Sequence, residues 1–222
     1  MNILFLDIEA SDLAADIGHI LSIGYKWNFE KKAHVLDILR YPGKTLNDDS
    51  KLLEVFRAVY NKADMVIHHF GTYYDVPFLQ TRLLINKQKP YPNIQQVDTW
   101  AIAKKKMRFG SNRLERILEV LGCPFSKSPV KLSIWADARL GDKKAIAYVV
   151  KHNLADVLVL EWVYNKIKAL YSSHPRVIPD KKLCGICGKG KLVSNGIRPT
   201  LKKVYRRLSC DKCGATEKGE IV

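Results

Sequence analysis

Four acidic side chains in the first 156 residues have the types and spacing needed to bind a pair of divalent metal ions. Asp7 and Glu9 lie two positions apart in the apolar run 3–11, and because strand side chains alternate, both point to one face. Two carboxylates so close repel each other and are costly to bury unless a cation neutralises them. Their oxygen atoms suit Mg²⁺ or Mn²⁺ rather than zinc. The alternative is an acidic, solvent-facing edge after a buried strand.

The other two acids lie in separate segments. Asp75 follows the apolar run 63–67 and precedes a helical pattern, so a strand has ended and a helix is about to begin. His152 and Asp156 are four residues apart in a helical pattern, which places them on one face. Alone, Asp75 would indicate a helix cap, and the His–Asp pair a surface contact. The order and context of the three segments favour a shared metal site.

These segments resemble the three motifs of the DEDD (DnaQ-like) 3′-5′ exonuclease superfamily. The motifs are D-x-E, an aromatic residue followed by Asp, and Asp with an upstream Tyr or His. The matching pairs are Asp7 and Glu9, Tyr74 and Asp75, and His152 and Asp156. Over its whole length the chain is similar to phage-type members that carry a C-terminal zinc ribbon.

Two positions depart from the family pattern. His69 is followed by Phe70, where family members often have Asn, so a hydrogen bond that orders this loop is missing. His152 stands three intervening residues before Asp156, a spacing at which the family normally uses Tyr. The role of His152 therefore follows less directly from the resemblance than the roles of the acids.

The resemblance implies phosphodiester hydrolysis with two metal ions about 3.5–4 Å apart. It implies that Asp7 bridges the ions, that Glu9 and Asp156 complete one coordination shell, and that Asp75 acts mainly through water. His152 would accept a proton from the attacking water or orient it, which suits an imidazole of ordinary pKa about 6.5. The alternative for His152 is a surface histidine that pairs with Asp156.

Several other polar residues have simpler explanations. His68 and His69 end a buried strand, where a core or loop-anchoring role is expected. Asp98 ends another strand just before a helix and is expected to be its N-cap. The segment 111–115 indicates a helix start capped by its serine, in which Asn112 and Arg113 are candidates for phosphate contact.

Four cysteines in two CxxC motifs, separated by 22 residues, predict a structural zinc site. Disulfides are the alternative, but the chain has no secretory signal and a fifth cysteine, Cys123, in an apolar setting. Four thiolate ligands leave no open coordination position, so this zinc would stabilise the fold. The predicted ligands are Cys184, Cys187, Cys210 and Cys213.

A chain of 222 residues suits one sizeable domain and a small appendage. Strand patterns fall at 2–7, 18–27, 33–39, 64–68 and 94–98, and helical patterns at 47–60, 75–86, 99–106, 112–121 and 142–170. Three strands without helices, followed by alternating strands and helices, favour an RNase H-like α/β fold with a central mixed sheet flanked by helices. The expected domains are an exonuclease domain over 1–171, a linker over 172–181 and a zinc ribbon over 182–222.

The formal net charge is +15, and residues 172–222 hold 12 Lys/Arg against 4 Asp/Glu. A basic segment with an interleaved aromatic side chain, expected on a strand, suits contact with a nucleic-acid backbone. A second basic cluster, residues 104–109, is a candidate to flank the substrate groove. The alternative is that the charge serves only solubility. The predicted contacts in the ribbon are Lys202, Lys203, Tyr205, Arg206 and Arg207.

These observations favour a metal-dependent 3′-5′ exonuclease that acts on nucleic acid, with DNA favoured and RNA possible, two Mg²⁺ or Mn²⁺ ions and one zinc ion. The alternatives are a structure-selective endonuclease or RNase on the same fold, and a non-catalytic adaptor. No segment resembles a membrane span or secretory signal, which with free thiols favours the cytoplasm of a prokaryotic or phage-infected host.

Overall fold

The structure is a computed structural model that describes residues 1–125, 129 and 131–222. Its centre is a five-stranded mixed sheet in the order β3-β2-β1-β4-β5. The first three strands pair antiparallel, whereas β4 and β5 run parallel to β1. This arrangement confirms the mixed α/β sheet expected of an RNase H-like fold. The strands are β1 (Ile3–Ala10), β2 (Ile20–Trp27), β3 (His34–Asp37), β4 (Met65–His68) and β5 (Gln95–Asp98).

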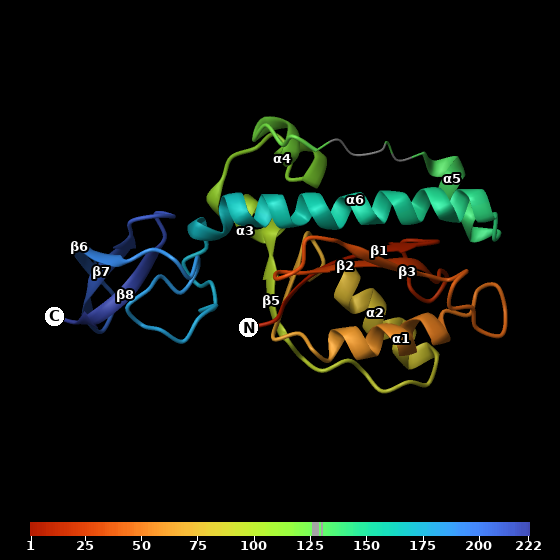
Figure 1. Cartoon of the computed structure of the whole chain (residues 1–222), viewed down its shortest axis with the longest axis horizontal. Coiled ribbons are helices and arrows are strands. Elements are labelled where there is room, and N and C mark those ends of the chain that lie inside the picture. Colours follow the sequence, from red (N-terminus) through yellow and green to blue (C-terminus); the bar gives the residue numbers. More distant parts are fainter. Residues whose placement is uncertain (126–128, 130) are drawn as a thin grey trace.

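Helices cover both faces of this sheet (Figure 1). Leu4, Leu6 and Ile8 of β1 pack in a cluster with α1 (Ser50–Tyr60) and α2 (Asp75–Ile85). Ile3 and Phe5 pack in a second cluster with α3 (Thr99–Lys106), α4 (Leu114–Val120) and the long helix α6 (Lys143–Ile167). Because side chains alternate along β1, Asp7 and Glu9 continue the odd-numbered face, which is covered by α6.

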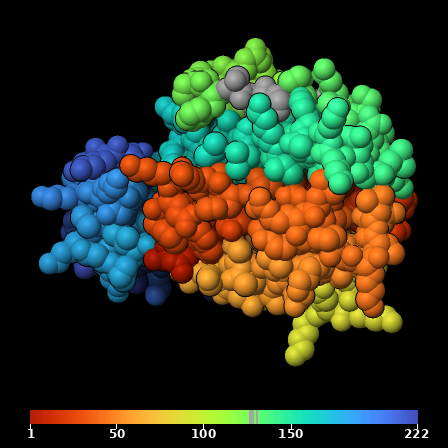
Figure 2. All heavy atoms as spheres, turned by 45° about the vertical axis from the view of Figure 1, so that its right-hand side comes forward, coloured from red at the N-terminus to blue at the C-terminus, as the bar shows by residue number. Residues whose placement is uncertain are grey.

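A second, three-stranded antiparallel sheet lies beyond the C-terminal end of α6 (Figure 1). It consists of β6 (Leu192–Pro199), β7 (Val204–Cys210) and β8 (Thr216–Ile221). The short 3-10 helix Lys168–Leu170 joins α6 to this part, and its Ala169 packs against the cysteine cluster. Figure 2 shows the C-terminal residues as a lobe beside the main body.

Most predicted elements agree with the structure to within a few residues, but helix α5 was missed and two local predictions were wrong. Helix α5 (Leu132–Arg139) was not predicted; it is short, and Ala138 is the one buried residue among its eight. Ser111 does not cap α4, whose N-cap is Arg113 without a side-chain hydrogen bond; the Ser111 hydroxyl accepts from the Arg113 N–H at 3.3 Å instead. Residues 202 and 203 lie in the turn before β7 rather than in the strand.

Helix α6 is long, but polar and charged side chains interrupt its apolar surface. Within the described residues, no helix is both long enough and apolar enough to span a membrane.

Candidate active site

Glu9, His152 and Asp156 converge where the odd face of β1 meets α6. Each offers one donor atom, and these atoms lie within 4.8 Å of one another. His152 Nε2 is 3.9 Å from Glu9 Oε1 and 3.6 Å from Asp156 Oδ2. His152 and Asp156 are buried and Glu9 is half-buried. Two carboxylates at such short range in a shielded position form a donor set that fits a divalent cation.

Asp7 lies beside this group and is held by an asparagine that the sequence analysis did not single out. Asn153 Nδ2 donates to Asp7 Oδ2 at 2.6 Å and to the Asp7 carbonyl at 3.1 Å. The Asn153 Oδ1 atom accepts from the Ser22 hydroxyl at 3.1 Å, so its amide is fixed at both ends. Gly24 is opposite Asp7 in the β1–β2 pairing, and a Cβ there would overlap Asn153. The missing side chain therefore lets α6 approach the sheet.

Asp75 begins α2 and reaches β1 from the other side of the site. Its Oδ1 accepts a hydrogen bond from the Ile8 N–H at 3.0 Å, between the two acids of β1. Burial raises the pKa of Asp75 to about 6, although the charge of His68 acts in the opposite direction. In the described residues, the close donor group includes neither Asp75 nor Asp7.

The negative charges of the acids affect the pKa of the Tyr74 hydroxyl. Its pKa is raised well above the usual range, first by burial and then by the charges of Asp75, Glu9 and Asp7. The hydroxyl of Tyr74 donates to the Asp12 carbonyl at 3.3 Å. The charges of the acids in the first two predicted segments therefore both contribute to raising the pKa of Tyr74.

Trp135 of α5 contacts the site directly and was missed by the sequence analysis. Its Nε1–H donates to Glu9 Oε2 at 3.1 Å. Its ring also stands edge-on to His152, with ring centroids 5.4 Å apart. With Leu13 and Leu132, these side chains line a hollow of about 370 Å³. No local signal in the sequence could have revealed Trp135, because it meets Glu9 across 126 positions and lies on an unpredicted helix.

Polar side chains at the ends of β4 and β5 interact with one another and with the segments that follow these strands. Asp98 caps α3 by accepting from the N–H groups of Trp100 and Ala101, which confirms the predicted N-cap. Burial alone would raise the carboxyl pKa of Asp98, but the His68 ring, whose Nδ1 lies 3.5 Å from Asp98 Oδ2, holds it well below the usual range. The His69 ring contacts the Thr99 hydroxyl and the Asn112 carbonyl, both at 2.9 Å. Both histidines therefore have the anchoring role expected of them.

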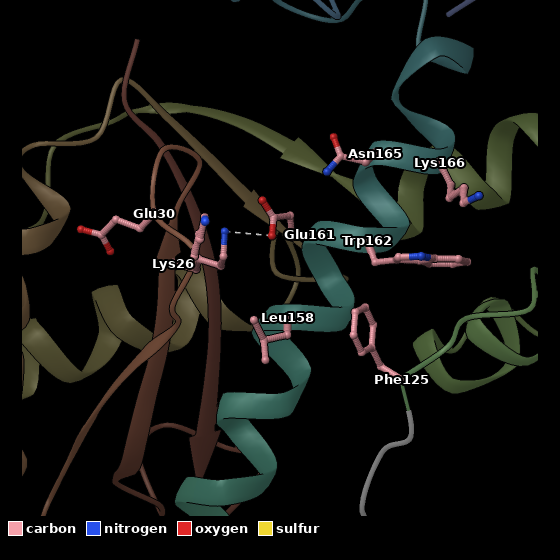
Figure 3. A pocket seen from close by; sticks show the side chains of 9 residues that line it. Lys26, Glu30, Phe125, Leu158, Glu161, Trp162, Asn165 and Lys166 are labelled. Carbon is pink, nitrogen blue, oxygen red and sulfur yellow. Dashed lines mark ion pairs between the residues drawn. The ribbon is translucent and has the colours of Figure 1, made fainter.

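A wider hollow of about 800 Å³ lies along the C-terminal half of α6 (Figure 3). Its lining includes Phe125, Leu158 and Trp162, and an ion pair joins Lys26 to Glu161 at 2.9 Å. None of the four predicted metal-binding acids lines it. This hollow is therefore separate from the group formed by Glu9, His152 and Asp156.

The four cysteines of the second sheet form one cluster. Their sulfur atoms lie within 4.8 Å of one another, and all five cysteines of the chain are free thiols in the structure. The Sγ atoms of Cys184 and Cys213, and those of Cys187 and Cys210, are 3.7 Å apart. Zinc–sulfur bonds of about 2.3 Å give a tetrahedron with edges of about 3.8 Å. The cluster therefore fits a tetrahedral zinc ion.

The predicted nucleic-acid contacts fall in two separate places. Tyr205, Arg206 and Arg207 lie on β7, with Lys202 and Lys203 in the turn before it. The Lys218 ammonium lies 4.7 Å from the centre of the Tyr205 ring, so this ring already has a cation at one face. Asn112 and Arg113 precede α4, where His69 contacts the Asn112 backbone.

Comparison with known proteins agrees with the fold. Residues 4–168 match the sequence model of the RNase_H_2 family, described as RNase_H superfamily. The family B DNA polymerase from the hyperthermophilic archaeon Pyrobaculum calidifontis has a similar fold, with a TM-score of 0.59 and 14% sequence identity. The match covers 78% of this chain but 26% of the polymerase, so the chain corresponds to about a quarter of that protein. Comparison with curated proteins gave no match. Because the matched residues include every strand of the central sheet and nearly all of the helices around it, the chain belongs to the RNase H superfamily.

Proposed function

We propose that this protein is a metal-dependent 3′-5′ exonuclease that hydrolyses phosphodiester bonds of nucleic acid, with DNA as the favoured substrate. The observation that carries the proposal is the convergence of Glu9, His152 and Asp156, with Asp7 and Asp75 beside them. Membership of the RNase H superfamily and the fold it shares with a DNA polymerase support a nuclease. The 3′-5′ direction rests on the motif resemblance.

In this proposal Glu9 and Asp156 would hold one divalent ion, Asp75 would contribute to a second mainly through water, and Asp7 would contribute to both. When bound, two Mg²⁺ or Mn²⁺ ions activate water and stabilise the charge on the leaving oxygen. His152 presents Nε2 to the same carboxylates, where it accepts a proton from the attacking water or orients it. Trp135 fixes Glu9 through its Nε1–H.

The C-terminal part completes the proposal. We assign residues 1–171 to the catalytic domain, 172–181 to a linker and 182–222 to a zinc ribbon. The four cysteines hold one structural zinc. The basic side chains of the turn and strand at 202–207 contact the phosphate backbone, which raises affinity in a salt-dependent manner and offsets repulsion between substrate and the acidic site.

The test uses Asp7→Asn and Asp156→Asn, with Asp137→Asn, an exposed acid of α5, as the matched control. Single-stranded DNA and RNA labelled at the 5′ or the 3′ end are digested with Mg²⁺ or Mn²⁺. We expect the wild type and the control to release the 3′ label first and to shorten 5′-labelled strands stepwise, while both site variants bind but do not cut.

Each alternative has its own product pattern. Internal cuts would indicate an endonuclease, and cleavage of RNA alone an RNase. Binding without any cleavage by the wild type would indicate an adaptor. Cleavage that survives in both site variants would place the chemistry elsewhere and overturn the assignment.

A further inference from the structure

Three aromatic side chains form a cluster on the loop after β4 and the start of α3, and two of them are exposed. The ring centroids of Phe70 and Tyr73 are 5.3 Å apart, those of Phe70 and Trp100 are 4.9 Å apart, and those of Tyr73 and Trp100 are 5.7 Å apart. Yet Phe70 is 41% exposed and Tyr73 is 61% exposed. Folding normally buries large apolar rings, so a cluster of rings that stays partly exposed indicates a binding surface. We name Phe70, Tyr73 and Trp100 the aromatic platform.

The platform is held in place by the surrounding structure. Phe70 has a φ of 67°, a left-handed conformation that a bulky residue adopts only where its surroundings impose it. The Asp98 carboxylate accepts from the N–H groups of Phe70 and Thr72, at 2.9 and 3.2 Å. The neighbouring His69 is fixed by its two ring contacts. The rings are therefore presented to solvent by a braced loop.

One cation contacts the platform, and further cations follow it in the chain. The Lys104 ammonium lies 4.6 Å from the centre of the Trp100 ring. Lys105, Lys106 and Arg108 follow it and are exposed. Residues 99–113 hold five Lys/Arg and no Asp/Glu. Exposed rings for base stacking, combined with cations for phosphates, are the composition of a site for single-stranded nucleic acid.

The platform adjoins Asp75 along the chain. Tyr73 precedes Asp75 by two residues, and two residues span at most about 7 Å, roughly one nucleotide step. Asp75 in turn accepts from Ile8, between Asp7 and Glu9. A strand whose scissile phosphate lies at the acids can therefore place a neighbouring base on the rings.

We propose that the aromatic platform and Lys104 bind unpaired bases of a single-stranded nucleic acid, next to the nucleotide that is cleaved. This proposal rests on the proposed function and deepens it, since it makes a single strand the substrate form. Duplex bases are stacked within the helix and cannot lie on the rings. Stacking does not distinguish DNA from RNA.

The test measures binding separately from cleavage. The full chain carries Asp156→Asn, and fluorescence anisotropy follows labelled decamers of thymidine, of uridine and of abasic sugar-phosphate, in which no base can stack. The platform variant is Phe70→Gly with Tyr73→Ser. Glycine tolerates the left-handed backbone at position 70, and thermal unfolding verifies that the variant is folded. The control is Phe29→Ala, an exposed phenylalanine stacked on Trp27 near the opposite end of β1.

We expect the platform variant to bind the thymidine and uridine decamers at least about tenfold more weakly, with little change for the abasic decamer or for the Phe29→Ala control. The proposal would be overturned if the platform variant and its parent bound the base-containing decamers with equal affinity. It would also be overturned if the variant lost as much affinity for the abasic decamer as for the base-containing ones. The absence of binding to any decamer would overturn it as well and would leave a protein partner as the explanation of the rings. If the platform variant bound the base-containing decamers more weakly but the wild-type chain cleaved no nucleic acid, the nuclease assignment would be refuted and the platform proposal would stand.

Discussion

The close approach of α6 to the sheet at Gly24 places the Asn153 amide against Asp7. Alanine at this position would place its Cβ 2.8 Å from Val157 Cγ2 and 2.9 Å from the Asn153 side-chain carbon and nitrogen. The backbone of Gly24 does not need glycine, because its φ lies outside the left-handed region. Gly24→Ala therefore tests helix approach without adding backbone strain.

The expected size of the effect follows from the overlap. To reach an ordinary contact of 3.4 Å, the nearest atom of α6 must recede by about 0.6 Å. Overpacking of this kind costs about 1–3 kcal/mol of unfolding free energy. The displaced atoms include the Asn153 amide that holds Asp7. Because small errors in the placement of reacting groups are costly, we expect the rate of hydrolysis to fall by about ten- to a hundredfold.

The assay compares Gly24→Ala with Gly110→Ala, where a Cβ would meet no atom within 4 Å. Urea unfolding gives the free energy, and hydrolysis of a labelled oligonucleotide with saturating Mn²⁺ gives the rate. We expect the Gly110 variant to equal the wild type in both. A Gly24 variant with wild-type rate and stability would refute the reasoning that this close contact sets the site.

Three further predictions concern the surroundings of the site and the C-terminal part. Trp135→Phe removes the N–H that binds Glu9, so we expect the rate at saturating substrate to fall about tenfold with unfolding free energy changed by less than about 1 kcal/mol; an unchanged rate would contradict it. We expect metal analysis to find one zinc per chain, and Cys187→Ser to lose it together with the protease resistance of the three-stranded sheet; full zinc content in that variant would exclude the cluster. Burial lowers the pKa of His174 in the folded state, where its Nε2 lies 2.8 Å from the Tyr164 hydroxyl oxygen. The unfolded chain then binds more protons, so stability falls as pH drops below about 6.5, by at most about 1.4 kcal/mol per pH unit. Urea unfolding at pH 7.5 and 5.5 should show a smaller loss in His174→Gln, and an equal loss would show that His174 does not contribute.

Local spacing in the sequence predicted much of the fold and named candidate residues. Alternation along the first strand placed Asp7 and Glu9 on one face, and helical spacing placed His152 above Asp156. The CxxC pairs predicted a four-sulfur cluster, which the structure contains. The strand and helix features depend on side-chain periodicity over fewer than ten residues, and the cysteine cluster depends on the spacing of a known metal-binding motif. Both kinds of signal can be read from the sequence without knowledge of the fold.

The tertiary structure alone decided which side chains meet. Asn153 holds Asp7 across 146 positions, and Trp135 holds Glu9 across 126. Gly24 matters only because α6 passes over it. Such contacts arise from the packing of a helix on a sheet, and no local period encodes them. The sequence by itself thus determined the kinds of chemistry available, whereas long-range packing decided how the reacting groups are held.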